Sequence, residues 1–283
     1  MKRNLLRICL LTAFGALLLA DVQAQFSAYL PVAGRTEVTV SHTVVSFDSF
    51  WAGTRRLDTR ATLGSSGKDQ TTTLLTIERG LSARWAADLT VGHTRAKLDA
   101  FPSDEGRADT VVGLRYQISD ELESFNRTLP TLTLRLGGII AGDYDEGLPF
   151  SAGDGASGAD FSLLFGRSLN RWVTLLGDVG YRWRDGAPEE LLGSAGVAVT
   201  CGQWVLSTAW RYEGSVSGLD IFGPGFGTAG GFPQTKERNS TLQAGVGFPV
   251  GDHLYLQVYG ALTLNGRNTG DKRIAGLAAS MGF

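Results

Sequence analysis

Hydrophobic and polar residues alternate with a period of two along much of the chain beyond about residue 35. In the segment from 253 to 265, for example, aliphatic residues alternate with Tyr255, Gln257 and Tyr259. Successive side chains of a β-strand point to opposite faces of the sheet, so this pattern predicts strands with one apolar and one polar face. The chain is therefore predicted to be all-β.

Twelve segments of about ten residues show this alternation between clusters of turn residues. They are Thr36–Val45, Gln70–Arg79, Trp85–Leu98, Arg107–Ile118, Pro130–Gly142, Gly158–Leu169, Trp172–Arg184, Leu191–Thr200, Trp204–Ser215, Glu237–Val250, His253–Asn265 and Lys272–Phe283. An even number of half-apolar strands predicts a transmembrane up-and-down antiparallel β-barrel. Ten strands stay open if the first hairpin is misread, and fourteen if a long loop contains another hairpin.

Short and long connections alternate between these segments. The short ones are Gly80–Arg84, Asn170–Arg171, Cys201–Gln203 and Gly251–Asp252, with Ser119–Leu129 as a longer exception. The long ones are Ser46–Asp69, Asp99–Gly106, Asp143–Ser157, Asp185–Glu190, Val216–Lys236 and Gly266–Asp271. Outer-membrane barrels have short periplasmic turns and longer external loops, so both termini are expected on the periplasmic side.

The polar faces of the predicted strands carry charges of both signs. A lipid-facing arginine at mid-membrane costs about 2–4 kcal/mol, so Arg135 is expected to point into the lumen. Glu37 has the same parity, and so do the residues predicted to line the pore, which are Glu78, Asp88, Asp109, Arg115, Arg135, Asp160, Asp178, Arg182, Arg211 and Glu213. Two interpretations stay open: an ion-pair network that stiffens the barrel, and a mixed-charge constriction that selects solutes.

The expected barrel is narrow. Twelve strands about 4.8 Å apart and tilted by about 40° give a backbone diameter of about 24 Å. Small residues recur on the inward faces, among them Gly113, Gly137, Gly245, Gly276 and Ser280. They favour free volume, and hence a pore for small molecules over a plugged lumen.

The loop Val216–Lys236 is unusually apolar for an external connection. Its large hydrophobic residues are Leu219, Ile221, Phe222, Phe226 and Phe232. The loop is interpreted either as a lid or hydrophobic mouth for the pore, or as a segment that packs against lipopolysaccharide or its own barrel.

Both ends of the chain are typical of an exported protein. Lys2, Arg3 and Arg7 precede an apolar run and Val22-Gln23-Ala24, which predicts a signal peptide over residues 1–24 and a barrel over 25–283. The apolar run is shorter than the roughly 20 residues of a membrane-spanning helix. The last strand ends on Phe283, as in the assembly signal of outer-membrane barrels. A soluble β-sandwich or small barrel is the alternative, but it does not explain aromatic residues at both ends of the strands.

Few residues favour covalent chemistry. After removal of the signal peptide only Cys201 remains, which excludes a disulfide framework and a cysteine metal site. His42 and His93 have lipid-facing parity, away from the neighbouring hydroxyls, so no enzyme site is predicted, although a lipid-modifying enzyme stays as a minor alternative. Asp143, Asp145 and Glu146 are interpreted as a solvated acidic loop, with a divalent cation site as the alternative. No cofactor and no nucleic acid partner are expected.

Several segments resemble a known family. Residues 106–116, with the sequence GRADTVVGLRY, are similar to a strand motif of the meta-pathway-of-phenol-degradation barrels. Leu132–Gly142 followed by Asp143, and then Gly158–Leu163 and Leu176–Arg182, are similar to the strands that follow in that family. The sequence departs from the family at Ala141 and Val112. The resemblance implies an outer-membrane channel or uptake porin, linked by the family name to aromatic catabolism.

We therefore expect a passive, narrow outer-membrane channel for small solutes, which can include apolar or aromatic ones. A structural or surface-interaction barrel with a plugged lumen is the alternative. Outer-membrane lipid, lipopolysaccharide, the barrel-insertion machinery and a small-molecule solute are the expected partners.

Overall fold

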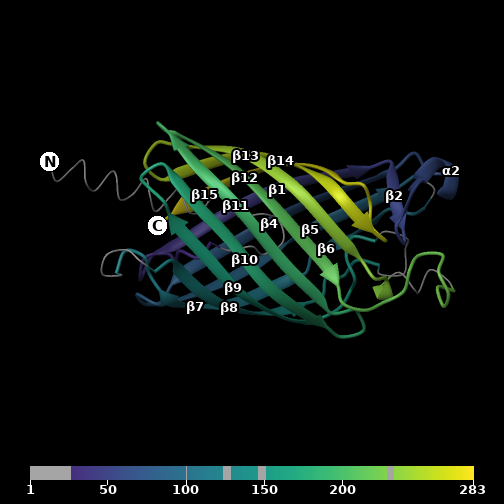
Figure 1. Ribbon diagram of the computed structural model, residues 1–283, viewed down its shortest axis with the longest axis horizontal. Helices are drawn as coiled ribbons and strands as arrows, with labels where there is room; N and C mark the ends of the chain where they lie inside the picture. Colours follow the sequence, from purple (N-terminus) through teal and green to yellow (C-terminus); the bar gives the residue numbers. More distant parts are fainter. Residues whose placement is uncertain (1–26, 100, 124–128, 146–150, 228–232) are drawn as a thin grey trace.

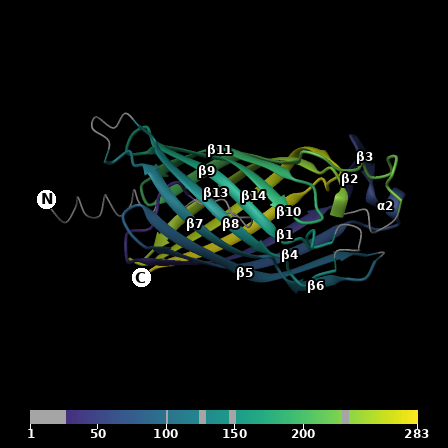
Figure 2. The same cartoon turned by 90° about the horizontal axis from the view of Figure 1, so that it is seen from below.

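A computed structural model describes residues 27–99, 101–123, 129–145, 151–227 and 233–283. Within these residues, twelve antiparallel strands form a closed barrel (Figures 1 and 2). They are β1 (Thr36–Phe47), β4 (Lys68–Gly80), β5 (Trp85–Leu98), β7 (Thr110–Ser119), β8 (Thr131–Ile140), β9 (Gly158–Ser168), β10 (Val173–Arg184), β11 (Glu190–Cys201), β12 (Trp204–Ser215), β13 (Arg238–Val250), β14 (Leu254–Arg267) and β15 (Arg273–Gly282). The predicted fold class and strand number are confirmed.

The barrel closes where the first strand meets the last. β1 pairs with β15 from Glu37 opposite Gly282 to Ser46 opposite Arg273, and its other edge pairs with β4. Neither strand is left with a free edge, and each strand pairs with its neighbours around the ring. Figure 1 shows the C-terminus at the end of the barrel opposite β2 (Ser49–Ala52) and α2 (Thr59–Leu63). That end carries the short turns and is the periplasmic one.

The two faces of the strands differ as the alternation predicts. On β14, Val258 and Leu262 are 56% and 58% exposed, whereas Tyr259 is 4% exposed and lies inside. Arg135 on β8 is 1% exposed, and its neighbour Leu136 is 60% exposed. Such a broad apolar outer surface is unfavourable in water but matches the hydrocarbon core of a bilayer. The barrel is thus a membrane-spanning one, with the architecture of the outer membrane.

Aromatic residues lie on the outer surface near both ends of the barrel. Trp85, Trp172 and Trp204 are exposed at or next to the periplasmic ends of their strands, and Trp183 is exposed near the external end of β10. These positions fit the two interfacial girdles of membrane barrels.

Tyr255 lies near the periplasmic end of β14 but does not belong to the outer girdle. Tyr255 is 4% exposed and packs in a small apolar cluster with Leu176, Ala198 and Val205 inside the barrel. Its parity follows that of Gln257 and Tyr259, and alternation along β14 therefore outweighs its position near the strand end.

The fourth predicted strand is interrupted. Its first part belongs to β6 (Asp104–Arg107), which pairs with the outer part of β5, and β7 starts only at Thr110. The break lets the Asp109 carboxylate accept hydrogen bonds from the Gly142 backbone N–H and the Tyr144 hydroxyl, at 2.9 and 2.6 Å. A carboxylate with two such donors is well satisfied at a strand break.

The first long loop contains a hairpin that does not enlarge the barrel. β2 (Ser49–Ala52) and β3 (Arg55–Asp58) form a separate two-stranded sheet, and the one-turn helix α2 (Thr59–Leu63) follows. Phe50 of β2 also forms an isolated bridge with Gly270. The Asp58 side chain caps α2 by accepting a hydrogen bond from the Ala61 N–H. In the described part of the chain, no helix is long and apolar enough to cross a membrane.

Several expectations fall on residues outside the described ranges. The signal peptide over residues 1–24 and its cleavage site lie there, as do Phe232 of the apolar loop and Glu146 of the acidic loop. These expectations stay predictions.

Candidate solute pathway

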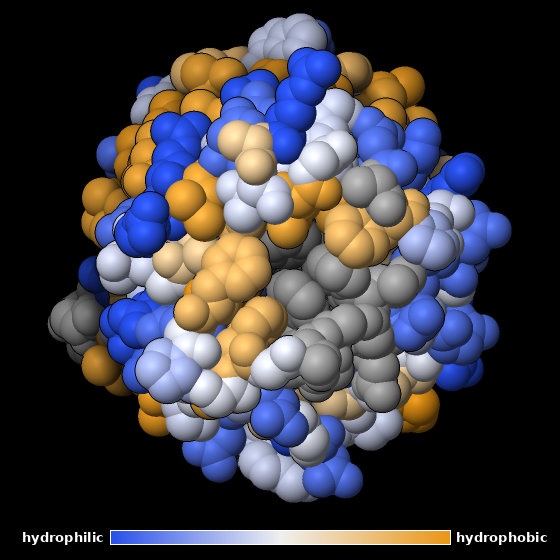
Figure 3. All heavy atoms as spheres, turned by 90° about the vertical axis from the view of Figure 1, so that its right-hand side faces the viewer, coloured by the Kyte–Doolittle hydropathy of each residue, from blue (hydrophilic) through white to orange (hydrophobic). Residues whose placement is uncertain are grey.

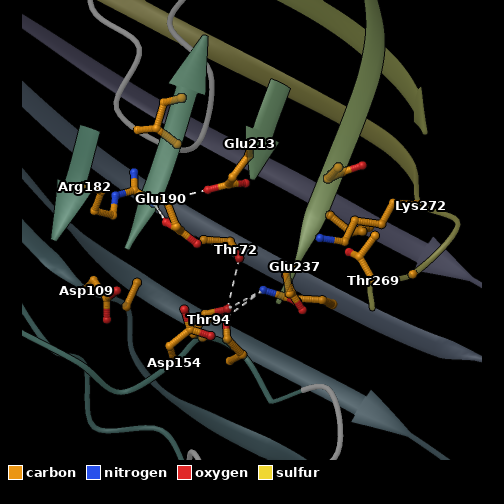
Figure 4. Close-up of a pocket in the computed structure, with 18 of the residues that line it drawn as sticks. Thr72, Thr94, Asp109, Asp154, Arg182, Glu190, Glu213, Glu237, Thr269 and Lys272 are labelled. Atoms are coloured by element: carbon orange, nitrogen blue, oxygen red, sulfur yellow. Dashed lines mark hydrogen bonds and ion pairs between the residues drawn. The ribbon is translucent and has the colours of Figure 1, made fainter. Parts of the chain in front are cut away.

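A cavity of about 370 Å³ occupies the external half of the lumen. Its wall comes from strands all around the barrel and from the external loops, which close over it on one side. Figure 4 shows polar side chains around this space, with Arg182, Glu190 and Glu213 on one side of the view and Glu237 and Lys272 on the other. The cavity is large enough for a small solute.

Two arginines on β10 hold three carboxylates on one wall of the cavity. Arg182 Nη1 lies 3.2 Å from both the Glu190 and the Glu213 carboxylate. Arg184 Nη2 lies 2.9 Å from Glu190 and 2.5 Å from Asp154 of the neighbouring loop. On this wall the carboxylates outnumber the guanidinium groups by three to two.

A second group of charges comes from the start of β4 and from the residues just before β13 and β15. The Lys68 ammonium is buried and donates a hydrogen bond of 2.9 Å to the Ser151 carbonyl. Glu237 immediately precedes β13, and burial raises the pKa of its carboxyl to about 7, although the neighbouring Lys272 ammonium offsets part of this effect. The charge of this second group therefore changes near neutral pH.

The periplasmic half of the lumen is different, because its charges are sealed from water. Arg115 is 0% and Arg135 1% exposed although both point into the lumen. Arg115 Nη2 lies 2.8 Å from the Glu78 carboxylate. Arg135 Nη2 lies 2.8 Å from the Asp88 carboxylate, and its Nη1 lies 2.6 Å from Asp160. Such a network is costly to disrupt, since loss of one partner leaves a buried charge unpaired.

The inward glycines do not leave free volume of the expected kind, and this inference is corrected. A Cβ added at Gly113 or Gly137 would lie 2.7 or 2.8 Å from the Arg135 guanidinium. At Gly245 it would lie 3.2 Å from the Tyr259 side chain, and at Gly276 it would clash with the ring of that tyrosine. These glycines therefore make room for large side chains to lie close to the barrel wall.

Two external segments meet at the outer end of the cavity and are here called the lid, which is a name for their position only. The lid comprises residues 49–63, which contain β2, β3 and α2, and residues 219–226. Phe47, Phe50 and Ile221 make its buried apolar cluster, and Phe226 packs against them. Figure 3, a view onto this end, shows hydrophobic side chains near the middle and hydrophilic ones around them.

Asn268 joins three external loops beneath the lid. It is fully buried, and its carbonyl oxygen accepts hydrogen bonds from the Gly53 and Ile221 N–H groups at 2.7 and 3.0 Å. Its amide nitrogen donates to the carbonyl groups of Leu219 and Lys236 at 3.2 and 2.9 Å. Asn268 has φ of +51°, a backbone conformation that asparagine tolerates better than most residues.

The same architecture occurs in solved membrane proteins. An outer membrane channel from Pseudomonas putida F1 superposes with a TM-score of 0.68 over 93% of this chain and 100% of that chain, at 14% sequence identity. The fold is that of an outer-membrane β-barrel. This is the fold that the family resemblance implied.

Looser likenesses include a KdgM porin, with a TM-score of 0.47 and 7% identity over 87% of this chain and 99% of that chain. Another is a TodX mutant named as a monoaromatic hydrocarbon channel, with a TM-score of 0.44 and 8% identity over 90% of this chain and 91% of that chain. No family model matches the sequence. No curated protein matches it either.

The structure divides the predicted pore-lining residues into two groups. Six of them line the cavity, namely Asp109, Asp160, Asp178, Arg182, Arg211 and Glu213. Glu78, Asp88, Arg115 and Arg135 also face the lumen but lie in the sealed network, which Asp160 connects to the cavity. Contact of either group with a solute stays a prediction.

Sequence reasoning missed several charged residues of the cavity, because they lie at strand ends or in loops. They are Lys68, Asp154, Arg184, Glu190, Glu237 and Lys272. For Arg184 a signal was available, since it shares the parity of Arg182, and for Glu190 the strand needed one more residue at its start. Asp154 reaches the cavity through loop folding, which no strand periodicity predicts.

The predicted residues of the apolar loop take different positions in the lid. Ile221 is buried and lines the cavity, and Phe226 packs against its cluster. Leu219 is partly buried, and its backbone bonds with that of Lys236. Phe222 is 60% exposed and makes an edge contact with Phe226 at 6.2 Å.

The acidic loop and the histidines have ordinary structural positions. The Asp143 carboxylate accepts a hydrogen bond from the Arg107 N–H, and the Asp145 N–H donates to Asp104. No group of His, Cys, Asp and Glu suited to a metal is found in the described ranges. His42 bonds through its ring to the Thr73 hydroxyl on the outer face, whereas Ser41 is buried on the lumen side.

Proposed function

We propose that the protein is a narrow passive channel for small polar solutes, with a preference for cations. The cavity carries this proposal, because seven carboxylates and five basic side chains line one space open to water. Acidic excess in a confined, low-dielectric lumen raises the local concentration of cations. The channel named among the structures of the same fold adds support.

The lining suits solutes with polar groups. Hydroxyl groups of Thr72, Thr94 and Thr241 lie between the charged walls and can exchange hydrogen bonds with a passing molecule. An aromatic solute that carries a hydroxyl, carboxyl or amino group fits the same lining, and Leu74 and Leu164 provide apolar contacts. No covalent chemistry is part of the proposed function.

Single-channel recording of the refolded protein in a planar bilayer tests the proposal. We expect discrete current steps and a reversal potential in a potassium chloride gradient that shows K⁺ to be more permeant than Cl⁻. Swelling of proteoliposomes in sugars of increasing size should show rapid passage of a four-carbon polyol and exclusion of a trisaccharide. Anion preference would contradict the charge argument, and silence at every voltage would overturn the channel.

A plugged structural barrel is the second candidate, and the sealed periplasmic network favours it. Arg115, Arg135 and Asp160 have almost no contact with water in the structure. Under this alternative no variant conducts, even with its external loops shortened. The same recordings therefore decide between the two candidates.

We further propose that the last strand engages the barrel-insertion machinery and that the external rim contacts lipopolysaccharide. Phe283 is 68% exposed at the end of β15, where a partner can reach it. Replacement of Phe283 by Ala should reduce the amount of barrel inserted in membranes while refolding in detergent is retained. A similar loss in both assays would point to a folding defect.

A further inference from the structure

We propose that the segment Ser27–Gly34, here called the strap, is a reversible closure of the periplasmic mouth of the channel. The inference rests on the proposed channel function and concerns its regulation. On this proposal the docked strap blocks passage from the cavity to the periplasm, and its release opens a path past the sealed charge network.

The strap crosses the mouth from one wall to another. At its C-terminal end, Ala33 forms a bridge with Gly80, and the Gly34 N–H donates a 2.8 Å hydrogen bond to the Gly80 carbonyl at the end of β4. Its other end contacts β8 and β9, and β5 and β7 lie between β4 and β8 in the order of the sheet. The strap therefore lies across the opening and not along one strand.

The tip of the strap is held inside the lumen by its backbone. The Thr133 hydroxyl on β8 donates a 2.6 Å hydrogen bond to the Ala28 carbonyl, and Ala28 is 1% exposed. Arg115 Nη1 donates to the Ser27 carbonyl at 3.3 Å. One arginine thus connects the tip directly to the sealed charge network, through its ion pair with Glu78.

Tyr29 provides the largest side-chain anchor. Its hydroxyl donates a 2.8 Å hydrogen bond to the Glu121 carboxylate, which also accepts the Ser168 N–H. A Cβ at Gly166 would lie 2.7 Å from the Tyr29 ring, so the glycine provides the space for this ring. The ring also packs against the apolar cluster that contains Leu176.

On this proposal, the docked strap keeps water from the residues beneath it. Thr131 and Thr133 are both 0% exposed, although their side chains point into the lumen near the periplasmic end of β8. Gly113 and Gly137 let the Arg135 side chain lie close to the wall, so the arginine does not need to span the opening. Removal of the strap is thus expected to expose these groups to water.

The attachment has the features of a reversible contact. The strap belongs to no strand of the barrel, and its outer part is in water, with Val32 65% exposed. Gly34 has φ of +82°, and a Cβ added there would meet nothing within 4 Å. A glycine in this conformation, with open space around it, is suited to act as a hinge.

A disulfide lock tests the proposal. In a Cys201→Ser background, Ala28→Cys and Thr133→Cys place two thiols at the bonded pair of the tip, so oxidation should join them, and the extent of crosslinking measures docking. We expect the crosslinked protein to be silent in planar bilayers and reduction with dithiothreitol to restore the current. The control has Thr72→Cys in place of Thr133→Cys, because Thr72 lies in the external cavity and should not crosslink.

A second variant avoids the need for a crosslink. Tyr29→Ala removes the ring and its bond to Glu121, and should raise the ratio of open to closed time about tenfold, which corresponds to about 1.4 kcal/mol. Tyr29→Phe retains the ring and should give a smaller increase. Val32→Ala, at the exposed part of the strap, is the matched control and should leave the ratio unchanged.

The outcomes of these experiments distinguish a failure of the strap proposal from a failure of the channel proposal. If the crosslinked and reduced proteins conduct equally, the strap is no closure and the channel stands. If crosslinking fails while Tyr29→Ala leaves gating unchanged, the docked strap is overturned in the same way. If the parent protein, Tyr29→Ala and a variant lacking residues 27–33 are all silent, the channel fails, and the strap proposal fails with it.

Discussion

The external and periplasmic halves of the lumen contain similar charged residues, but these residues differ in their exposure to water. In the external half, Arg182 and Glu213 border a cavity, and Glu213 keeps 35% of its side chain exposed. In the periplasmic half, Arg135 and Asp88 are in contact at 2.8 Å with at most 1% of either side chain exposed. The same pattern of inward charges therefore borders a cavity in one half and forms a sealed ion-pair network in the other.

The difference comes from what covers the charges. Strand alternation places all of these side chains inside, but the external ones face a space that the lid bounds from above. The periplasmic ones lie beneath the strap, which binds Thr133 and Arg115 through its backbone carbonyls. Whether a lumen residue lines a pathway thus depends on segments outside the barrel strands.

The largest effect is expected on the stability of the barrel when the sealed network of the periplasmic half is disrupted. Arg135→Ala leaves the buried carboxylates of Asp88 and Asp160 without their common partner and should destabilise the barrel by about 3–5 kcal/mol. Urea unfolding of the refolded protein measures this loss. Arg95→Ala is the control, because its ion pair with Glu105 is exposed and should contribute little. Equal effects of the two variants would contradict the sealed network.

The strand pattern alone predicted the barrel but not this division. Alternation placed Arg135 and Glu213 correctly inside, because the period of two is enforced by lipid on one face. It could not show that Gly137 lies beneath the Arg135 side chain, since that depends on packing across neighbouring strands. The contacts of Asn268 and of the strap could not be predicted from the strand pattern either, because they join segments far apart in sequence.

The next largest effect is expected on the local stability of the lid. Asn268→Ala removes four hydrogen bonds to backbone groups of two loops and should lower the local stability of the lid by about 1–3 kcal/mol. Limited proteolysis of the intact barrel should then cleave residues 49–63 faster, while the urea midpoint changes little. The exposed Asn265→Ala is the control. Unchanged cleavage would show that Asn268 does not hold the lid.

A smaller effect is expected on ion selectivity, which should change with substitutions in the external half but not with those in the periplasmic half. Glu213→Gln removes a charge at the cavity and should lower the ratio of K⁺ to Cl⁻ permeability about twofold. Glu78→Gln removes a charge from the sealed network and should leave this ratio unchanged while it lowers stability. Reversal potentials measure both. A larger change of selectivity in Glu78→Gln would reverse the assignment of the halves.

The smallest effect is a pH dependence in the external half. The pKa of Glu237 is raised to about 7 by burial, so its carboxyl is largely neutral at pH 6 and charged at pH 8. Cation preference should therefore increase between these pH values, and Glu237→Gln should flatten the increase. A decrease of cation preference with rising pH would contradict the sign of this charge.

The central claim is that water reaches the external half of the lumen but not the periplasmic half beneath the strap. Reaction of a small cationic thiol reagent with Thr72→Cys and with Thr133→Cys, both in a Cys201→Ser background, measures this directly. Thr72 lines the cavity, whereas Thr133 is 0% exposed. The account predicts at least about a hundredfold faster reaction at residue 72, a difference of about 2.7 kcal/mol, and a rate at residue 133 that rises when residues 27–33 are deleted. Equal rates at the two positions with the strap present would contradict it.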